Sequence, residues 1–530
     1  MSLVEVTDLT VGFGALKAVD GLSFGLAPGA ALALVGESGS GKSTVASALL
    51  GLHRGTGGRV GGSIEVAGTD VQRASEDELR RLRGGKAAMV FQDPLSSLDP
   101  YYAIGDQIAE VHCVHTRVSR RAARARAVEV LERVGIPDAS RRSRSRPHEF
   151  SGGMRQRALI AMALACRPGL LIADEPTTAL DVTVQAQILD LLHTLREETG
   201  LGLLLVTHDV GVAAESVDEV LVMRHGRVLE HGPVGDVLRS PTQAYTRSLL
   251  DAVPRGDAPR APSRASDEIV LEATGLRREF GRGKRAFTAV DDVSLRVHRG
   301  ETLGVVGESG SGKTTLGRML VGLLEPTAGQ VRYEGHARVG VNPAVQMVFQ
   351  DPVSSLNPRR SVGESIADPL RARGERDETR IRGRVTELLE RVGLEAAHYD
   401  RYPHEFSGGQ RQRVGIARAL AADPRVIVCD EPVSALDVTT QAQVVELLGE
   451  LQRELGLALV FVAHDLAVVR RVSDRVAVMR QGRIVESGPA DEVYDNPQDP
   501  YTKQLLAAVP ALDPEVAARR RTARREPASA

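Results

Sequence analysis

The sequence predicts an α/β fold that occurs twice along one chain of 530 residues. Two observations lead to this prediction. Glycine-rich loops with nearly the same sequence occur at residues 36–43 and 307–314, and each follows a short apolar run. Other apolar runs, such as 169–173 and 203–207, are too short for helices and are typical of parallel strands buried on both faces. The same kind of core is therefore expected in each half.

Both loops match the pattern G-x-x-x-x-G-K-[ST]. Backbone N–H groups of such a loop surround phosphates, while its lysine reaches the β/γ oxygens. β-rich runs at residues 3–6 and 31–35 precede the first loop, which is expected to open a helix at Lys42. The duplicated motif predicts that the chain binds ATP at two sites. The loop residues assigned to ATP are Gly36, Glu37, Ser38, Gly39, Ser40, Gly41, Lys42, Ser43 and Thr44, and Gly307, Glu308, Ser309, Gly310, Ser311, Gly312, Lys313, Thr314 and Thr315.

The two copies keep constant offsets over long stretches. The loops are 307 − 36 = 271 residues apart, whereas His208 and His464 are 464 − 208 = 256 residues apart. Most of this 15-residue difference lies between the glycine-rich loop and a glutamine further along each copy, Gln92 or Gln350. There the first copy has an additional polar segment that includes residues 69–84. We expect this segment to be a surface excursion. The pattern between residues 94 and 165 is helical with Arg-rich faces, which predicts a helical piece inserted into the α/β core.

Composition indicates the domain boundaries. The segment that starts at Pro254 is rich in Pro, Ser and Arg and is typical of an extended linker. The chain ends in a basic run that begins at Arg519 and is predicted to be disordered. The predicted parts are a first nucleotide-binding domain at 1–253, a linker at 254–268, a second nucleotide-binding domain at 269–510 and a basic disordered tail at 511–530.

Charge and cysteine content exclude several classes of protein. The net charge of −2 is not the positive charge that is typical of nucleic-acid-binding proteins, so no nucleic-acid partner is expected. Cys113, Cys166 and Cys429 are far apart and form no CxxC pair, which argues against disulfides or zinc and fits a reducing cytoplasm. No apolar run approaches the roughly 18 residues of a membrane span, and the N-terminus does not look like a signal peptide.

Paired carboxylates end an apolar run in each copy. Asp174 and Asp430 are placed to hold Mg²⁺ together with the loop hydroxyls of Ser43 and Thr314. The adjacent residues Glu175 and Glu431 are placed to orient an attacking water. An isolated Asp-Glu pair is commonly just a solvated strand end, but two such pairs downstream of two phosphate loops favour ATP hydrolysis.

A Ser-Gly-Gly run lies between the phosphate loop and the acidic strand of each copy. Such a run can cap a helix and lets the backbone approach an anion at the helix N-terminus. In this position, twice, it makes the chain resemble the ATP-binding cassette (ABC) ATPases over about residues 3–510. The resemblance implies two P-loop NTPase nucleotide-binding domains, each with an inserted helical subdomain and an antiparallel β subdomain. The signature residues assigned to ATP are Ser151, Gly152, Gly153, Ser407, Gly408, Gly409 and Gln410.

The resemblance assigns further roles residue by residue. Phe13 is expected to stack on adenine; in the second copy Phe280 is the better candidate and Phe287 the alternative, because four extra residues blur the register. Asp181 and Asp437 match the loop that links the two sites. The implied catalytic residues are Glu175, His208 and Gln92, and Glu431, His464 and Gln350. The implied metal-site residues are Ser43, Gln92 and Asp174, and Thr314, Gln350 and Asp430.

The resemblance also implies an intramolecular pseudo-dimer of the two cassettes. Each ATP, with Mg²⁺, would lie between the phosphate loop of one copy and the signature of the other. Both sites keep a glutamate and a histidine, so both are expected to be competent. Met154 departs from the commoner glutamine, but its Phe-Ser-Gly-Gly-Met context resembles the first of the paired ATPases in peptide importers.

Finer features resemble the ATPases of oligopeptide and dipeptide importers. These features are the Pro-His-Glu-Phe runs that start at Pro147 and Pro403 and the C-terminal elements around Tyr245 and Tyr501. The resemblance implies uptake of a small solute, most simply peptides, at the cytoplasmic face of the membrane. It also implies two integral-membrane permeases and an extracytoplasmic substrate-binding protein as partners. No cysteine follows Cys429, so no iron–sulfur cluster is expected. The alternatives are nickel or glutathione-like cargo, and a soluble twin-cassette ATPase that acts on ribosomes.

Overall fold

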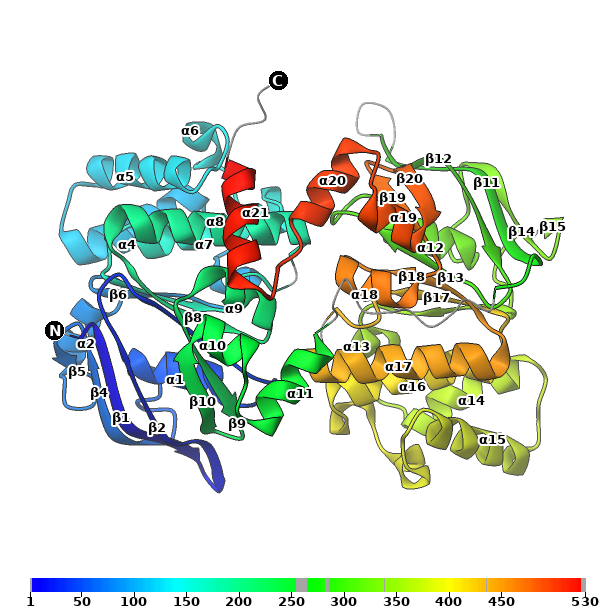
Figure 1. Cartoon of the computed structure of the whole chain (residues 1–530), viewed down its shortest axis with the longest axis horizontal. Helices are drawn as coiled ribbons and strands as arrows, with labels where there is room; N and C mark the ends of the chain where they lie inside the picture. The colour runs from blue at the N-terminus through cyan, green and yellow to red at the C-terminus, as the bar shows by residue number, and fades with distance from the viewer. Residues whose placement is uncertain are drawn as a thin grey trace. The chain divides into compact units, whose positions relative to one another are not determined.

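Two compact units make up the chain in the computed structural model (Figure 1). The structure describes residues 2–178, 180–253, 265–281, 286–337, 339–434 and 436–525. The first unit contains Met1–Leu180, Val184–Ala252 and Pro510–Ala530, and the second contains Asp181–Thr183 and Val253–Val509. None of the helices within these described ranges has the length and hydropathy that a membrane span requires.

A six-stranded sheet forms the centre of the first unit, in the order β10-β9-β3-β8-β7-β6. Its strands are parallel except for β10, which pairs antiparallel with β9 at one edge. Strands β3, β7 and β8 are buried along their whole length, as their continuous apolar sequences predict. The strands are β3 (Ala31–Val35), β6 (Ala87–Val90), β7 (Leu170–Asp174), β8 (Gly202–Thr207), β9 (Glu219–Arg224) and β10 (Arg227–Pro233).

A second, antiparallel sheet covers one side of this unit, in the order β2-β1-β4-β5. Side chains of β2 alternate between buried and exposed from residue 21 onward, which is the pattern of a strand with one face on the core. The predicted antiparallel subdomain is thereby confirmed. Its strands are β1 (Val4–Phe13), β2 (Leu16–Leu26), β4 (Gly58–Val66) and β5 (Thr69–Asp70).

Helices of the first unit lie between these strands in the chain, and the segment from α3 to α7 forms the predicted helical insertion between β6 and β7. The expectation of a mere surface excursion at residues 69–84 is wrong in one respect. The segment folds into β5 and α2, and Leu79 and Leu82 are fully buried in the core. The helices are α1 (Lys42–Leu49), α2 (Glu76–Leu82), α3 (Pro94–Ser97), α4 (Ile104–Thr116), α5 (Arg120–Arg133), α6 (Ala139–Arg142), η1 (Pro147–Glu149), α7 (Gly152–Leu164), α8 (Val182–Thr199), α9 (Val210–Ser216), α10 (Val234–Arg239) and α11 (Ala244–Ala252).

The second unit repeats this architecture. Its sheets have the orders β12-β11-β14-β15 and β16-β17-β18-β13-β19-β20. Its strands are β11 (Ile269–Phe280), β12 (Phe287–His298), β13 (Thr302–Val306), β14 (Ala328–Tyr333), β15 (His336–Ala337), β16 (Val345–Val348), β17 (Val426–Asp430), β18 (Ala458–Val462), β19 (Arg475–Arg480) and β20 (Arg483–Pro489). Its helices are α12 (Lys313–Leu320), α13 (Pro352–Ser355), α14 (Val362–Ala372), α15 (Glu378–Arg391), η3 (Ala396–Asp400), η4 (Pro403–Glu405), α16 (Gly408–Ala421), α17 (Val438–Leu455), α18 (Leu466–Val472), α19 (Ala490–Asp495) and α20 (Pro500–Ala507).

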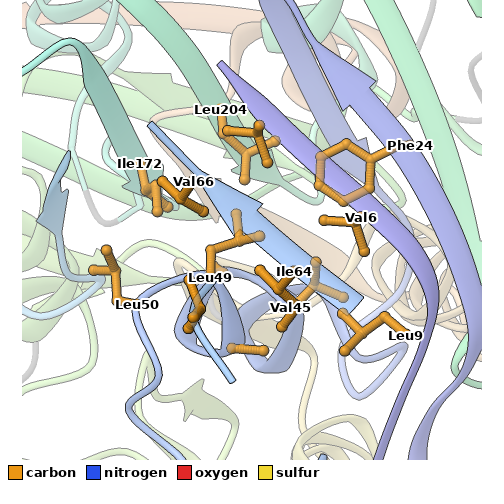
Figure 2. Packing of buried hydrophobic residues seen from close by; sticks show 14 of the residues in the cluster. Val6, Leu9, Phe24, Val45, Leu49, Leu50, Ile64, Val66, Ile172 and Leu204 are labelled. Atoms are coloured by element: carbon orange, nitrogen blue, oxygen red, sulfur yellow. The ribbon is translucent and has the colours of Figure 1, made fainter. Parts of the chain in front are cut away.

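The main core of the first unit lies between its two sheets and around α1. Figure 2 shows Val6 and Phe24 of the antiparallel sheet and Val45 of α1 in one cluster with Ile172 of β7 and Leu204 of β8. An equivalent cluster fills the second unit. Because α1 and α12 follow the glycine-rich loops directly, burying these helices fixes both loops against the parallel sheets.

The two predicted irregular segments have different outcomes. Most of the linker expected at 254–268 lies outside the described residues. The tail expected to be disordered from residue 511 instead forms helix α21 (Pro514–Arg525), which belongs to the first unit, so that expectation is wrong for these residues. The physical reason is that this basic helix finds acidic partners on the first unit, as described below.

Candidate nucleotide-binding sites

Each glycine-rich loop joins a central strand to a helix. The loop at residues 36–43 connects β3 to α1, and the loop at residues 307–314 connects β13 to α12. Gly41 and Gly312 have φ values of 100° and 103°, which L-residues with side chains rarely adopt. A Cβ on Gly41 would lie 2.4 Å from the carbonyl oxygen of Ala18, so the loop leaves no room for another residue there. The motif is therefore set by backbone geometry.

The loop lysines are held by their own loops. Lys42 is buried, and its Nζ donates to the carbonyl oxygens of Gly36 and Glu37, each at 2.7 Å. Lys313 Nζ makes the equivalent bonds to Gly307 at 2.7 Å and Glu308 at 2.8 Å. Burial lowers the pKa of Lys313 against the attraction of nearby carboxylates. The structure thus places an ammonium group among the backbone groups of each loop.

A hydroxyl–carboxylate pair lies beside each lysine. Ser43 Oγ donates to Asp174 Oδ1 at 3.0 Å, and Thr314 Oγ1 donates to Asp430 Oδ1 at 3.0 Å. Both aspartates end a buried strand, and burial raises the pKa of each carboxyl although the hydroxyl bond and the loop lysine oppose this shift. Hydroxyl and carboxylate oxygens are hard donors of the kind that Mg²⁺ prefers. Within the described ranges, no cluster of three or more His, Cys, Asp or Glu side chains is arranged to hold a metal by itself.

Glu175 is the centre of a hydrogen-bonded group in the first unit. Gln92 Nε2 donates to Glu175 Oε2 at 2.8 Å, and Thr178 Oγ1 donates to the same oxygen at 2.9 Å. His208 Nδ1 lies 3.3 Å from Glu175 Oε1. Burial opposes ionisation of Glu175, but the hydrogen bond and charge of His208 outweigh it and lower the pKa of this carboxyl. The same pairing raises the pKa of His208 against the effect of burial.

The second unit repeats this arrangement. Gln350 Nε2 donates to Glu431 Oε2 at 2.7 Å, and His464 Nδ1 lies 3.4 Å from that oxygen. Burial again opposes ionisation, and pairing with His464 again lowers the pKa of Glu431. The pKa of His464 is raised by this pair, although burial acts in the other direction. The structure thus brings the predicted glutamine, glutamate and histidine together in each unit.

The signature runs begin helices in the helical part of each unit. Ser151 Oγ accepts from the Met154 N–H, and Ser407 Oγ accepts from the Gln410 N–H, each at 3.3 Å, as expected for N-caps. The second glycine of each run has a packing role that the sequence did not reveal. A Cβ on Gly409 would lie only 2.2 Å from the Thr440 methyl of α17, and Gly153 is equally restricted by α8.

The aromatic candidates lie at the ends of the antiparallel hairpins. Phe13 ends β1 and pairs with Leu16, and Phe280 ends β11 and pairs with Phe287. Phe280 therefore occupies the position that corresponds to Phe13. Its ring stacks on that of Phe287 with a centroid distance of 5.6 Å, so both candidates of the second unit share one surface.

Two tyrosines that the sequence analysis did not assign contact the glycine-rich loops. The Tyr245 hydroxyl accepts from the Glu37 N–H at 3.2 Å, and the Tyr501 hydroxyl accepts from the Glu308 N–H at 3.1 Å. Burial is the main cause that raises the pKa of Tyr501 to about 12. The two tyrosines are 501 − 245 = 256 residues apart, the offset of the repeat, and that recurrence could have identified them.

The fold and the clustered side chains define a twin P-loop ATPase. The family model for the ABC transporter matches residues 19–178 and 290–434, and the one for the oligopeptide/dipeptide transporter C-terminal region matches residues 229–278 and 485–530. The glutathione import ATP-binding protein GsiA of Escherichia coli (strain K12) is 46% identical over 97% of this chain and 90% of its own length. GsiA of Pectobacterium atrosepticum is 45% identical with the same coverage. Among solved structures, cbiO1 from Clostridium perfringens, part of an ABC transporter complex, has 30% identity, covers 43% of this chain and 92% of its own, and has a TM-score of 0.39.

The chain belongs to the ABC transporter family. It is an ATPase subunit with tandem cassettes, in the branch that carries the oligopeptide/dipeptide C-terminal region and includes import ATP-binding proteins. Membership places it peripherally at the cytoplasmic face of the membrane, where it works with membrane permeases. The predicted family and class of fold are confirmed.

Proposed function

We propose that the chain powers the import of short peptides or peptide-like solutes such as glutathione. The observation that carries the proposal is that each copy brings a glutamine, a glutamate and a histidine together and is followed by a region of the peptide-transporter type. Relatives of nearly the same length are glutathione import proteins. Glutathione is itself a tripeptide, so the expected peptide cargo and the glutathione-like alternative describe one class of solute.

We assign the chemistry of each site to its own side chains. Lys42 and Lys313 would neutralise the terminal phosphates of ATP, while the loop N–H groups bind their oxygens. Glu175 and Glu431 would orient the attacking water and accept its proton, and their lowered pKa values favour the ionised form that this role requires. His208 and His464 would leave their glutamates to contact the γ-phosphate.

The oxygen donors fit a magnesium ion held jointly with the nucleotide. Ser43 and Asp174, with Gln92 nearby, would hold it in the first site, and Thr314, Asp430 and Gln350 would do so in the second. The ion would neutralise the charge that develops on the phosphate oxygens. We also expect that no iron–sulfur cluster is bound, since no cysteine follows Cys429.

We further propose that the two cassettes act as an intramolecular pseudo-dimer. Signature residues 407–410 would complete the first ATP site, and residues 151–154 would complete the second. Phe13 and Phe280 would stack on the adenines. The domains would extend over residues 1–253 and 269–510. ATP binding would favour the closed form, and hydrolysis would return the pair to the open form.

Purification from native membranes tests this proposal. A tag on the full chain, mild detergent and mass spectrometry should identify two permeases and an extracytoplasmic substrate-binding protein. ATP turnover of that complex should rise when glutathione or a dipeptide is added with the binding protein, and not when Ni²⁺ is added. Stimulation by Ni²⁺ alone would contradict the peptide assignment, and recovery of ribosomes without permeases would contradict transport.

A further inference from the structure

The last segment of the chain packs on the first unit, beside α9 (Figure 1). We call residues 510–525, which include α21, the tail segment. Ala517 of α21 is 1% exposed, so the helix has a buried side. Pro510 lies so close to Gly211 of α9 that a Cβ on this glycine would be 3.0 Å from the proline Cβ. A segment that follows the second cassette in the chain thus completes a surface of the first.

An ion-pair group holds the acidic start of the tail segment. Arg239, the last residue of α10, donates to Asp513 Oδ1 at 3.2 Å and to Glu515 Oε1 at 2.9 Å. Asp513 also caps the start of α21 by accepting from the Glu515 N–H at 2.9 Å. One arginine of the first unit therefore contacts two carboxylates at the N-terminal end of the helix.

A second group holds the basic end. Arg524 donates to both carboxylate oxygens of Asp190 in α8, at 3.0 and 3.1 Å, and its guanidinium lies 3.8 Å from Glu215 in α9. Arg521 donates to the carbonyl oxygen of Glu215 at 2.8 Å. Arg524 and Glu215 are largely buried, with side chains 16% and 5% exposed, so this contact is less screened by solvent than a surface ion pair.

The second cassette has opposite charges at two corresponding positions. With the offset of 256 residues, Glu215 corresponds to Arg471, and Arg239 corresponds to Asp495. Arg471 would repel the arginines of the tail segment, and Asp495 would repel its acidic start. Asp495 already pairs with Arg470 at 2.7 Å. The surface that receives the tail segment is therefore specific to the first cassette.

The same comparison applies to the close approach at Gly211. Its counterpart in the second cassette is Ala467, which carries the Cβ that would crowd Pro510. Steric fit and charge thus select the same surface.

The helix under the tail segment begins two residues after His208, to which we assign a role at the first ATP site. His208 is followed by Asp209, whose Oδ1 accepts from the N–H groups of Gly211 at 2.8 Å and Val212 at 3.3 Å and so caps α9. We propose that the tail segment is a docking element for the first cassette alone, and that it positions His208 by holding α9. The positioning part rests on the proposed function of His208. The two ATP sites then differ, because only the first has its histidine helix held by the chain's own end.

Hydrogen exchange of the full-length protein tests the docking. Arg239→Asp introduces the residue that the second cassette carries, and amides of residues 514–525 and 210–216 should then exchange at least roughly tenfold faster. The matched control Asp495→Arg should leave both segments unchanged, and the double variant Arg239→Glu/Glu515→Arg should restore protection. Fast exchange of residues 514–525 in the wild type would overturn the docking. Exchange of residues 210–216 that is unchanged both in Arg239→Asp and in a chain that ends at residue 511 would also overturn it.

The titration of His208, followed by NMR, tests the positioning. Undocking by Arg239→Asp should change the apparent pKa of His208 and leave that of His464 unchanged. Equal titration of His208 in docked and undocked chains would overturn the positioning role. Neither measurement uses ATP or transport, so a failure of the proposed function would be seen separately, as absent ATP turnover in the wild type.

Discussion

Glu175 and Glu431 combine an unusual backbone with a largely buried charge. Their φ values are 48° and 45°, in the left-handed region that residues with side chains seldom adopt. Such a conformation costs on the order of 1–3 kcal/mol and persists where surrounding bonds hold it. Here the N–H groups of the two glutamates donate to Val206 at 2.9 Å and to Val462 at 2.8 Å, at the ends of the central strands. The same conformation recurs in both copies at Arg167 and Asp423 and at His225 and Gln481, so it is a feature of the shared fold.

Replacing the glutamate by its amide should separate binding from hydrolysis. In Glu431→Gln the side chain keeps its size but cannot accept a proton, so ATP turnover at the second site should fall by about 10²-fold or more while ATP still binds there. Phosphate release and equilibrium ATP binding measure the two effects. The matched control Glu446→Gln, at an exposed position of α17, should turn over normally. Normal turnover in Glu431→Gln would rule out its role as base.

Pairing with glutamate should raise the pKa of His208. Its pKa is raised above 6.5 and that of Glu175 is lowered below 4.5. The histidine part of this stabilisation is fully present below pH 6.5 and is lost as the pH rises through the folded pKa. The glutamate part is present above pH 4.5 and is lost as the pH falls through its folded pKa. The pair should therefore be strongest between about pH 4.5 and 6.5.

NMR of labelled histidines measures this shift. The His208 signal should titrate above pH 6.5 in the wild type and at lower pH in Glu175→Gln, where the neutral amide no longer favours the charged ring. His464 in the same variant provides the internal control, because its partner Glu431 is unchanged. A His208 titration that is identical in both proteins would show that the pair does not form in solution.

The tyrosine contacts predict a role for the C-terminal element at the ATP site. Tyr501→Phe removes the acceptor for the Glu308 N–H, and a neutral hydrogen bond contributes about 1 kcal/mol. The KM for ATP should therefore rise several-fold with little change in kcat, measured by steady-state hydrolysis. Tyr102→Phe, at an exposed position of the helical insertion, is the control. An unchanged KM would show that ATP binding at this loop does not depend on the hydrogen bond from Glu308 to Tyr501.

At the residue scale, the residues that could be predicted from the sequence are those in motifs with a fixed order and spacing. Lys42, Asp174 and Glu175 could be assigned because loop and strand end recur in the same order in both copies. Tyr245 could not, since its contact with the loop depends on how α11 folds back onto the strand–loop junction. A hydroxyl that accepts one backbone hydrogen bond has no sequence motif of its own. The only sign in the sequence is that the tyrosine recurs at the repeat offset of 256 residues.

At the scale of elements, the glycines of the signature have separable roles. Gly409 meets Thr440 of α17 at a distance where a Cβ cannot be accommodated without movement, whereas a Cβ on Gly408 would lie an ordinary 3.4 Å from Leu436. Gly409→Ala should therefore reduce stability by about 1–3 kcal/mol, as overpacking does. Gly408→Ala should leave stability nearly unchanged. Calorimetric melting of the two variants compares them directly, and equal melting temperatures would contradict the packing role of Gly409.

Elements with a strong apolar period were predictable, and short polar ones were not. The central strands were expected from their continuous apolar sequences, and the structure buries β3 and β7 completely. The segment at residues 69–84 looked like a surface excursion because most of it is polar. Its helix α2 buries only Leu79 and Leu82, which is too few apolar positions to show a helical period within a charged segment.

At the scale of the whole molecule, duplication conceals an asymmetry. The repeat makes both cassettes look alike in their motifs, and the basic run after Arg519 looks like a solvated end. Its partners Asp190 and Glu215 lie more than 300 residues earlier in the chain, so no local pattern predicts the contact. A comparison of the two copies for reversed charges, rather than for shared motifs, would have pointed to this surface.

Docking of the tail segment should weaken as the pH rises. Glu215 is enclosed by Arg520 and Arg524 of α21, by Asp190 of α8 and by the Ala511 N–H. Burial raises the pKa of Glu215 from 4.5 to about 7, and the charge of Arg524 does not compensate for it. Because the docked state raises this pKa, docking takes up a proton. The contribution of Glu215 to docking is therefore fully present below pH 4.5 and is lost as the pH rises through about 7.

Exchange protection of residues 514–525, corrected for the intrinsic pH dependence of amide exchange, should fall between pH 6 and 8 in the wild type. Glu215→Gln keeps the shape of the side chain without a titratable group, so its protection should be independent of pH over this range. Protection that falls equally in both proteins would assign the pH dependence to another group. Protection that rises with pH would mean that the ion pair between Arg524 and Glu215 outweighs the burial of Glu215.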